Sequence, residues 1–91
     1  MNMEHLRFTV LKEIYSTLEQ GAEGVNKFKL MCGDVYPRDC RIDIVLQQLE
    51  TQGFVTKMED KYSITSSGKE VIDFLDEVGK YSLPLNFNFK Y

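Results

Sequence analysis

The chain has 91 residues, of which 43% are apolar and 27% are charged, and its formal net charge is −3. This length suits one domain and excludes two independent cores, and the composition argues against a disordered chain. No apolar run reaches the roughly 20 residues that span a bilayer, and residues 1–7 lack the apolar stretch of a signal peptide. We therefore expect a cytoplasmic protein with no membrane partner.

Residues that carry metal or covalent chemistry are scarce. Cys32 and Cys40 form no CxxC motif, and with the single histidine, His5, they fall short of the four ligands of a structural zinc site. Reduced thiols are expected, with a disulfide as the alternative. The sequence has no Ser/His/Asp grouping, Gly-rich phosphate loop or metal-ligand spacing, so we expect neither an enzyme nor a cofactor.

A first helix is predicted from Glu4 to about Gln20, where apolar residues recur at spacings of three and four and Arg7 is placed outside the apolar stripe. Gly21 suits its C-terminal end, and residues 21–25 then suit a very short strand or an extended turn. The residues of the stripe are Leu6, Val10, Leu11, Ile14, Tyr15 and Leu18.

Two further helices are predicted in the middle of the chain. Asn26 suits the N-cap of a short helix that Gly33 closes. The next helix runs from about Pro37, which fits a first helical turn, to Gln52, and Gly53 stops it. Its apolar face comprises Ile42, Val45, Leu46 and Leu49.

A β-hairpin and a last helix follow. Residues 54–58 and 62–65 are rich in β-forming residues and flank a polar turn at residues 59–61. Thr65, Ser66 and Ser67 supply hydroxyls for the N-cap of the last helix, and Ser67 with Glu70 fits a capping box.

The segment 82–91 has a different pattern, because apolar and polar residues alternate strictly along it. Such alternation predicts a half-buried strand. The predicted organisation is therefore a domain at residues 1–81 and an extended aromatic tail at residues 82–91. We expect the tail to pair with a second copy, with packing on its own first and last helices as the alternative.

The order of elements, three helices and then a hairpin, is that of a winged helix-turn-helix. In detail, residues 46–75 read LQQLETQGFVTKMEDKYSITSSGKEVIDFL, with a helix that ends in Leu-x-x-x-Gly-Phe-Val, a return strand Tyr-Ser-Ile-Thr and a Thr-x-x-Gly helix start. This stretch resembles the small winged-helix regulators of archaea and their viruses and, more distantly, the MarR and PadR groups. The resemblance implies an α+β fold with a three-helix core, a two-stranded β-wing and a C-terminal helix.

The resemblance also implies a transcriptional regulator that binds double-stranded DNA, with the third helix in the major groove and the wing on the backbone. Arg and Gln are the usual readers of guanine and adenine, and lysines contact phosphates. The residues that we expect to contact DNA are Lys27, Lys29, Tyr36, Arg38, Arg41, Gln47, Gln48, Lys57 and Lys61. Those that we expect at a homodimer interface are Phe74, Leu75, Val78, Leu83, Leu85, Phe87 and Phe89.

The charge of the expected DNA-binding region leaves a second reading open. Residues 24–63 contain six basic and six acidic residues, so this surface is neutral, and Asp39 and Asp43 on the third helix would face phosphates. A winged helix that binds a protein partner instead of DNA is therefore the alternative function.

Overall fold

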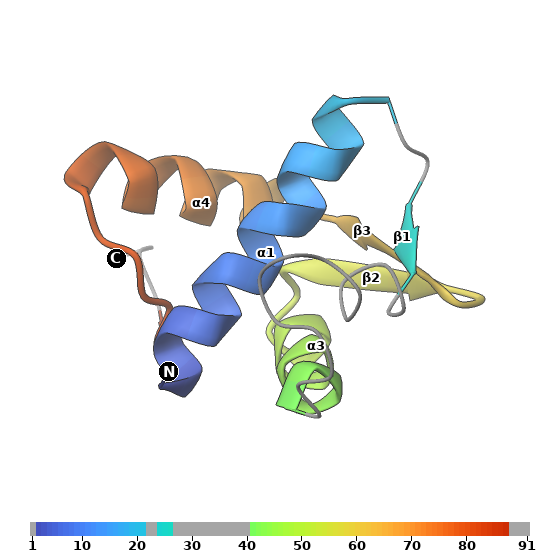
Figure 1. Ribbon diagram of the computed structural model, residues 1–91, viewed down its shortest axis with the longest axis horizontal. Helices are drawn as coiled ribbons and strands as arrows, with labels where there is room; N and C mark the ends of the chain where they lie inside the picture. Colours follow the sequence, from blue (N-terminus) through green and yellow to red (C-terminus); the bar gives the residue numbers. More distant parts are fainter. Residues whose placement is uncertain (1, 22–23, 27–40, 88–91) are drawn as a thin grey trace.

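The computed structural model describes residues 2–21, 24–26 and 41–87. Over these ranges the protein is a small α+β fold, in which three helices pack with an antiparallel sheet (Figure 1). The predicted second helix, its apolar side and the two cysteines lie outside the described residues. The element order is α1 (Met3–Glu19), β1 (Val25–Asn26), α3 (Arg41–Thr51), β2 (Val55–Met58), β3 (Lys61–Ile64) and α4 (Ser66–Val78).

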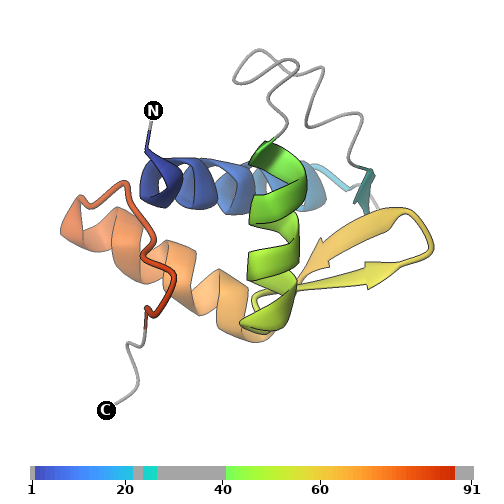
Figure 2. The same cartoon turned by 90° about the horizontal axis from the view of Figure 1, so that it is seen from below.

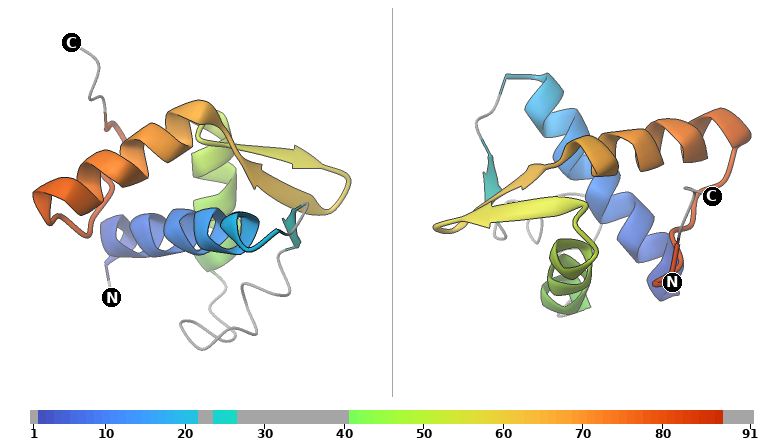
Figure 3. Two further views of the ribbon diagram at one scale, coloured as in Figure 1. Left: turned by 90° about the horizontal axis from the view of Figure 1, so that it is seen from above. Right: turned by 180° about the vertical axis from the view of Figure 1, so that it is seen from behind.

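Helix α1 runs through the middle of the molecule and matches the prediction closely. Asn2 is its N-cap, since the side chain accepts a 2.8 Å hydrogen bond from the backbone N–H of His5. Helix α4 lies beside α1, and α3 crosses below them (Figures 2 and 3). The expected stripe is buried, with Leu6, Leu11 and Ile14 fully inaccessible to solvent.

Arg7 corrects the sequence prediction, which placed it outside the apolar stripe. Its residue is only 5% exposed. Position 7 lies one turn before Leu11 and two turns before Ile14, on the same side of the helix as the core. The structure therefore buries a guanidinium group among apolar residues.

Helix α3 buries its predicted apolar face, and the end of the helix is stabilised by glycine. Gly53 has a positive φ of 81°, which is favourable for a residue without a side chain. The backbone N–H of Gly53 donates to the carbonyl of Glu50, and that of Phe54 donates to the carbonyl of Leu49, each over 3.0 Å. These two bonds form a Schellman motif, which satisfies carbonyls at the helix end and turns the chain into β2.

The sheet has the strand order β1-β3-β2, and both pairs of strands are antiparallel. In the hairpin, Val55 pairs with Ile64 and Met58 pairs with Lys61. The turn is one residue shorter than predicted, because Lys61 already belongs to β3 and Glu59 adopts a positive φ of 59°. The short strand predicted near residues 21–25 corresponds to β1.

Helix α4 begins at a different cap from the predicted one. Thr65, not Ser67, is the N-cap: its Oγ1 accepts a 3.1 Å hydrogen bond from the N–H of Gly68 and donates one of 2.6 Å to the carbonyl of Gly53. The predicted Ser67–Glu70 capping box is therefore wrong, because Ser67 already lies inside the first helical turn.

Gly68 joins α4 to the hairpin. A Cβ atom at this position would come within 2.7 Å of the Ile64 Cγ1 atom and closer still to the carbonyl oxygen of Phe54. The expectation that this glycine permits close packing of helix and hairpin is met.

The tail between residues 82 and 87 does not form the predicted strand. It turns at Leu85 and Asn86, and the N–H of Phe87 donates a 3.1 Å hydrogen bond to the carbonyl of Pro84. Leu83 is completely buried in the core, and its N–H donates a 2.8 Å hydrogen bond to the carbonyl of Glu4. Over these residues, packing on the chain's own helices, which was the alternative, is what the structure has.

Candidate nucleic-acid interface

The outward face of α3 is the surface on which the sequence placed DNA recognition. With about 100° between successive helical residues, Ile44, Gln47 and Thr51 lie opposite the buried side of the helix. All three are exposed, and half of the Ile44 surface is open to solvent. This central stripe, which we call the α3 stripe, carries no charge.

The two edges of the α3 stripe differ. Asp43 and Glu50, seven residues apart and both exposed, lie on one edge. Arg41 and Gln48 lie on the other edge, which faces the tail, and both are half-buried. Arg41 has an interaction partner. Anionic groups therefore border the stripe on one side only.

The hairpin supplies the exposed cations of this region. It extends from the body of the molecule on one side of α3, while the tail lies on the other side (Figure 2). Lys57 on β2 and Lys61 on β3 are both exposed, and the Lys57 Nζ lies 5.7 Å from the centre of the Tyr62 ring. Glu59 and Asp60 lie between them at the turn, so the hairpin tip combines two cations with two anions.

Gln48 is held by the core and is not a free reading group. The Arg7 guanidinium donates through Nη1 to the Gln48 Oε1 over 2.9 Å and through Nε to the Leu83 carbonyl over 2.7 Å. Arg7 thereby connects α1, α3 and the tail. In the part of the chain that the structure describes, both partners of the guanidinium are neutral oxygens.

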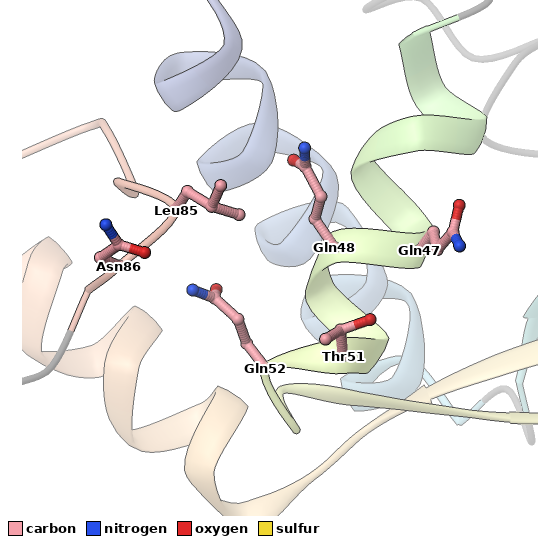
Figure 4. A pocket seen from close by; sticks show the side chains of 6 residues that line it. All are labelled: Gln47, Gln48, Thr51, Gln52, Leu85 and Asn86. Carbon is pink, nitrogen blue, oxygen red and sulfur yellow. The ribbon is translucent and has the colours of Figure 1, made fainter.

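A pocket lies between the C-terminal half of α3 and the tail (Figure 4). Its volume is about 430 Å³. Gln52 contributes a side-chain oxygen that is buried and has no hydrogen-bond partner. The residues that line the pocket are Gln47, Gln48, Thr51, Gln52, Leu85 and Asn86.

Some of the predicted interface residues cannot be placed. Lys27, Lys29, Tyr36 and Arg38, which the sequence assigns to DNA, lie outside the described residues, as does Phe89 of the expected dimer interface. Of the residues assigned to DNA, the structure brings Gln47 and Gln48 together on α3 and Lys57 and Lys61 together on the hairpin.

The residues expected at a dimer interface divide into two groups. Leu75 and Leu83 are buried in the protein's own core, with at most 1% of their surface exposed. Phe74, Val78 and Leu85 are between 42% and 48% exposed. Phe87 is half-buried, and its ring centre lies 6.3 Å from that of Phe74. The exposed apolar side chains of α4 and the tail thus remain available to a partner, whereas Leu75 and Leu83 do not.

Sequence reasoning missed the residues that join α3 to the tail. Arg7 had a signal, because its spacing from Leu11 and Ile14 places it on the buried stripe. Gln52 and Asn86 had none, since their proximity depends on the turn in the tail.

Within the described residues, no three His, Cys, Asp or Glu side chains gather where they could hold a metal ion. None of the described helices is both long and apolar enough to cross a membrane. No protein-family model, curated protein or solved structure matches the chain.

Proposed function

We propose that this protein is a winged helix-turn-helix regulator that binds double-stranded DNA, with α3 in the major groove and the β2–β3 hairpin as the wing. The observation that carries the proposal is the uncharged, exposed α3 stripe with a lysine-bearing hairpin beside it. A helix fits the major groove, and a hairpin next to it reaches the adjacent backbone.

The α3 stripe has the chemistry to read A·T base pairs. A glutamine amide such as that of Gln47 forms two parallel hydrogen bonds with adenine, and an exposed aliphatic group such as Ile44 packs against the methyl group of thymine. Lys57 and Lys61 would contact phosphates, which position the protein without reading sequence. The acidic edge formed by Asp43 and Glu50 opposes binding.

A titration of mixed genomic DNA fragments at several salt concentrations tests this function. We expect binding that weakens with salt, and Lys57→Ala should reduce the logarithmic salt slope by about one. Lys80→Ala is the control, because Lys80 is exposed at the far end of α4. Absence of salt-dependent binding even at low ionic strength would overturn the proposal.

A second pair of variants tests the face of α3 directly. Glu50→Gln removes an anion beside the α3 stripe and should tighten DNA binding several-fold. Glu13→Gln makes the same change at an exposed position of α1 and should leave the affinity unchanged. Equal effects of the two variants would show that DNA does not approach α3.

We also propose that the regulator is a homodimer that pairs through α4 and the tail. Phe74 and Val78, one helical turn apart, present exposed apolar side chains, and Leu85 adds a third. Two copies would match two half-sites about one helical turn of DNA apart. Phe74→Ser should convert the dimer to a monomer in a solution mass measurement, whereas a dimer mass that persists in this variant counts against this interface.

The alternative function, a winged helix that binds a protein, is favoured by one observation. Ile44 on α3 and Met58 near the hairpin tip are 50% and 76% exposed, and apolar side chains at such positions suit a protein surface. If DNA binding is absent, Ile44→Ser is the variant with which to test a protein partner.

A further inference from the structure

The pocket between α3 and the tail has the features of a ligand site. We propose that it binds a small uncharged heteroaromatic molecule, of the size of a free nucleobase or nucleoside. The proposal concerns a site beyond the DNA-binding face and does not depend on DNA binding. It is supported by an unpartnered buried acceptor, an oriented amide, the chemistry of the lining and the size of the pocket.

The first support is the side-chain oxygen of Gln52. This Oε1 atom is buried and accepts no hydrogen bond. A buried acceptor without a donor costs about 1–3 kcal/mol, and most such groups in folded proteins are satisfied. Exchanging the amide oxygen and nitrogen would only bury an unpartnered donor in its place. A ligand N–H in the pocket would satisfy the Gln52 oxygen.

The second support is the fixed orientation of Gln48. Its Oε1 accepts from the Arg7 guanidinium, so its amide N–H groups are left for another acceptor. Arg7 is itself held by the Leu83 carbonyl and is buried, so the amide is oriented before any ligand arrives. The pocket therefore offers a held donor at Gln48 and an unsatisfied acceptor at Gln52.

The third support is the character of the lining. The six residues that line the pocket include four side-chain amides and one hydroxyl, and none of the six is ionisable. Donors and acceptors without charge complement a ligand that has both and is itself neutral, such as the hydrogen-bonding edge of a nucleobase. Leu85 supplies an apolar surface against which a flat ring can pack.

The fourth support is size. The pocket volume of about 430 Å³ falls within the range of roughly 300–1,000 Å³ that is usual for small-molecule sites. The walls come from α3 and from the tail, which Arg7 and the Glu4 carbonyl hold in place. The site is therefore formed before binding.

The test is a titration of the whole chain with adenosine, guanosine, cytidine and uridine in turn, followed through backbone amide shifts in NMR spectra. At least one nucleoside should bind and shift the amides of residues 47–52 and 84–87 together. Ribose alone should not. No shift with any of the four nucleosides, or shifts elsewhere only, would overturn the proposal.

Variants then test the role of the unpartnered oxygen. Gln52→Leu removes an unsatisfied buried acceptor, so the fold should be retained while nucleoside affinity falls at least about fivefold, equivalent to about 1 kcal/mol. Gln20→Leu, at an exposed position at the end of α1, is the matched control and should bind as the unchanged protein does. Undiminished affinity in Gln52→Leu would overturn the assignment.

Two further arms keep the result interpretable. Asn86→Ala changes an exposed pocket residue in the tail and should also weaken binding, which keeps the proposal testable if Gln52→Leu fails to fold. A short single-stranded oligonucleotide should bind no more tightly than the free nucleoside. Binding of the oligonucleotide alone would contradict a site for a free small molecule. None of these measurements contains duplex DNA, so their failure is separate from failure of the proposed function.

Discussion

The Nη1 atom of Arg7 donates a 2.9 Å hydrogen bond to the Oε1 atom of Gln48, which lies 41 residues later in the chain. The same guanidinium donates to the Leu83 carbonyl, which lies 76 residues later. One buried side chain of α1 therefore positions both walls of the pocket, α3 and the tail.

We expect Arg7→Met to destabilise the protein by about 1–2 kcal/mol. The substitution leaves the Leu83 carbonyl and the Gln48 oxygen without their donor, and relief from burying a cation offsets part of that loss. Urea unfolding measures the difference. Lys12→Met on the same helix is the control, since the Lys12–Asp76 ion pair has side chains 43% and 37% exposed and should contribute less than about 1 kcal/mol. A more stable Arg7→Met variant would show that burial of the cation costs more than its two bonds contribute.

Gly68→Ala should destabilise the protein by more than about 2 kcal/mol, although alanine is the better helix former by about 1 kcal/mol. The added Cβ would overlap the Phe54 carbonyl and the Ile64 side chain, so α4 would have to move away from the hairpin. Gly53→Ala is the comparison, because its Cβ would meet open space and only the positive φ, at a cost of about 1 kcal/mol, opposes it. Thermal or urea unfolding ranks the two, and a smaller loss in Gly68→Ala would contradict this packing.

Thr65→Ala should cost about 1–2 kcal/mol, because it removes both the N-cap hydrogen bond to Gly68 and the bond to the Gly53 carbonyl. Ser67→Ala should change the free energy of unfolding by less than about 0.5 kcal/mol, since Ser67 lies past the cap. Urea unfolding of the pair distinguishes the observed cap from the one expected from sequence. The reverse order of losses would favour the Ser67 cap.

The phenol of Tyr15 should make stability fall at alkaline pH. Partial burial, then the charges of Asp73 and Glu19, and a 3.3 Å hydrogen bond to Asp73 raise the pKa of Tyr15 above 10.0. The folded protein therefore holds this proton more firmly than the unfolded chain does. The resulting stability is fully present below pH 10.0 and is lost as the pH rises through the raised pKa.

Spectrophotometric titration of tyrosine ionisation, with Tyr15→Phe to identify the signal, measures this pKa. Asp73→Asn removes a carboxylate that raises the pKa and should lower it toward 10.0. In urea unfolding above pH 10.0, Tyr15→Phe should lose less stability with rising pH than the unchanged protein does. A Tyr15 pKa that does not fall in Asp73→Asn would exclude the carboxylate as a cause.

Local patterns predicted the regular elements well. The spacing of apolar residues located α1 and the described part of α3, and the glycine after α3 was correctly assigned as its stop. These features depend on neighbours within one or two turns, which a sequence displays directly. The cap of α4 was misassigned because three adjacent hydroxyls compete locally, and the bond from Thr65 to the Gly53 carbonyl decides between them.

The tail shows where such patterns fail. Alternation from Leu83 to Phe87 is compatible with a strand, but a strand needs a neighbour to pair with, and α1 instead accepts the N–H of Leu83 through the Glu4 carbonyl. The pocket was missed for the same reason, because its walls lie more than 30 residues apart in the chain. Of the candidate DNA-binding residues, those on α3 and the hairpin lie on the elements expected, and their role stays a prediction.

The bond between the Leu83 N–H and the Glu4 carbonyl also bears on how the protein folds. It joins residues separated by nearly the full described length, together with the 2.7 Å contact of the His5 Nδ1 atom with the Tyr81 carbonyl. Contacts of such long range pay a large loop-closure entropy and form slowly unless the intervening chain is already ordered. During synthesis, Arg7 and the seat for Leu83 therefore wait until almost all other elements have been made. The order of assembly places the tail last.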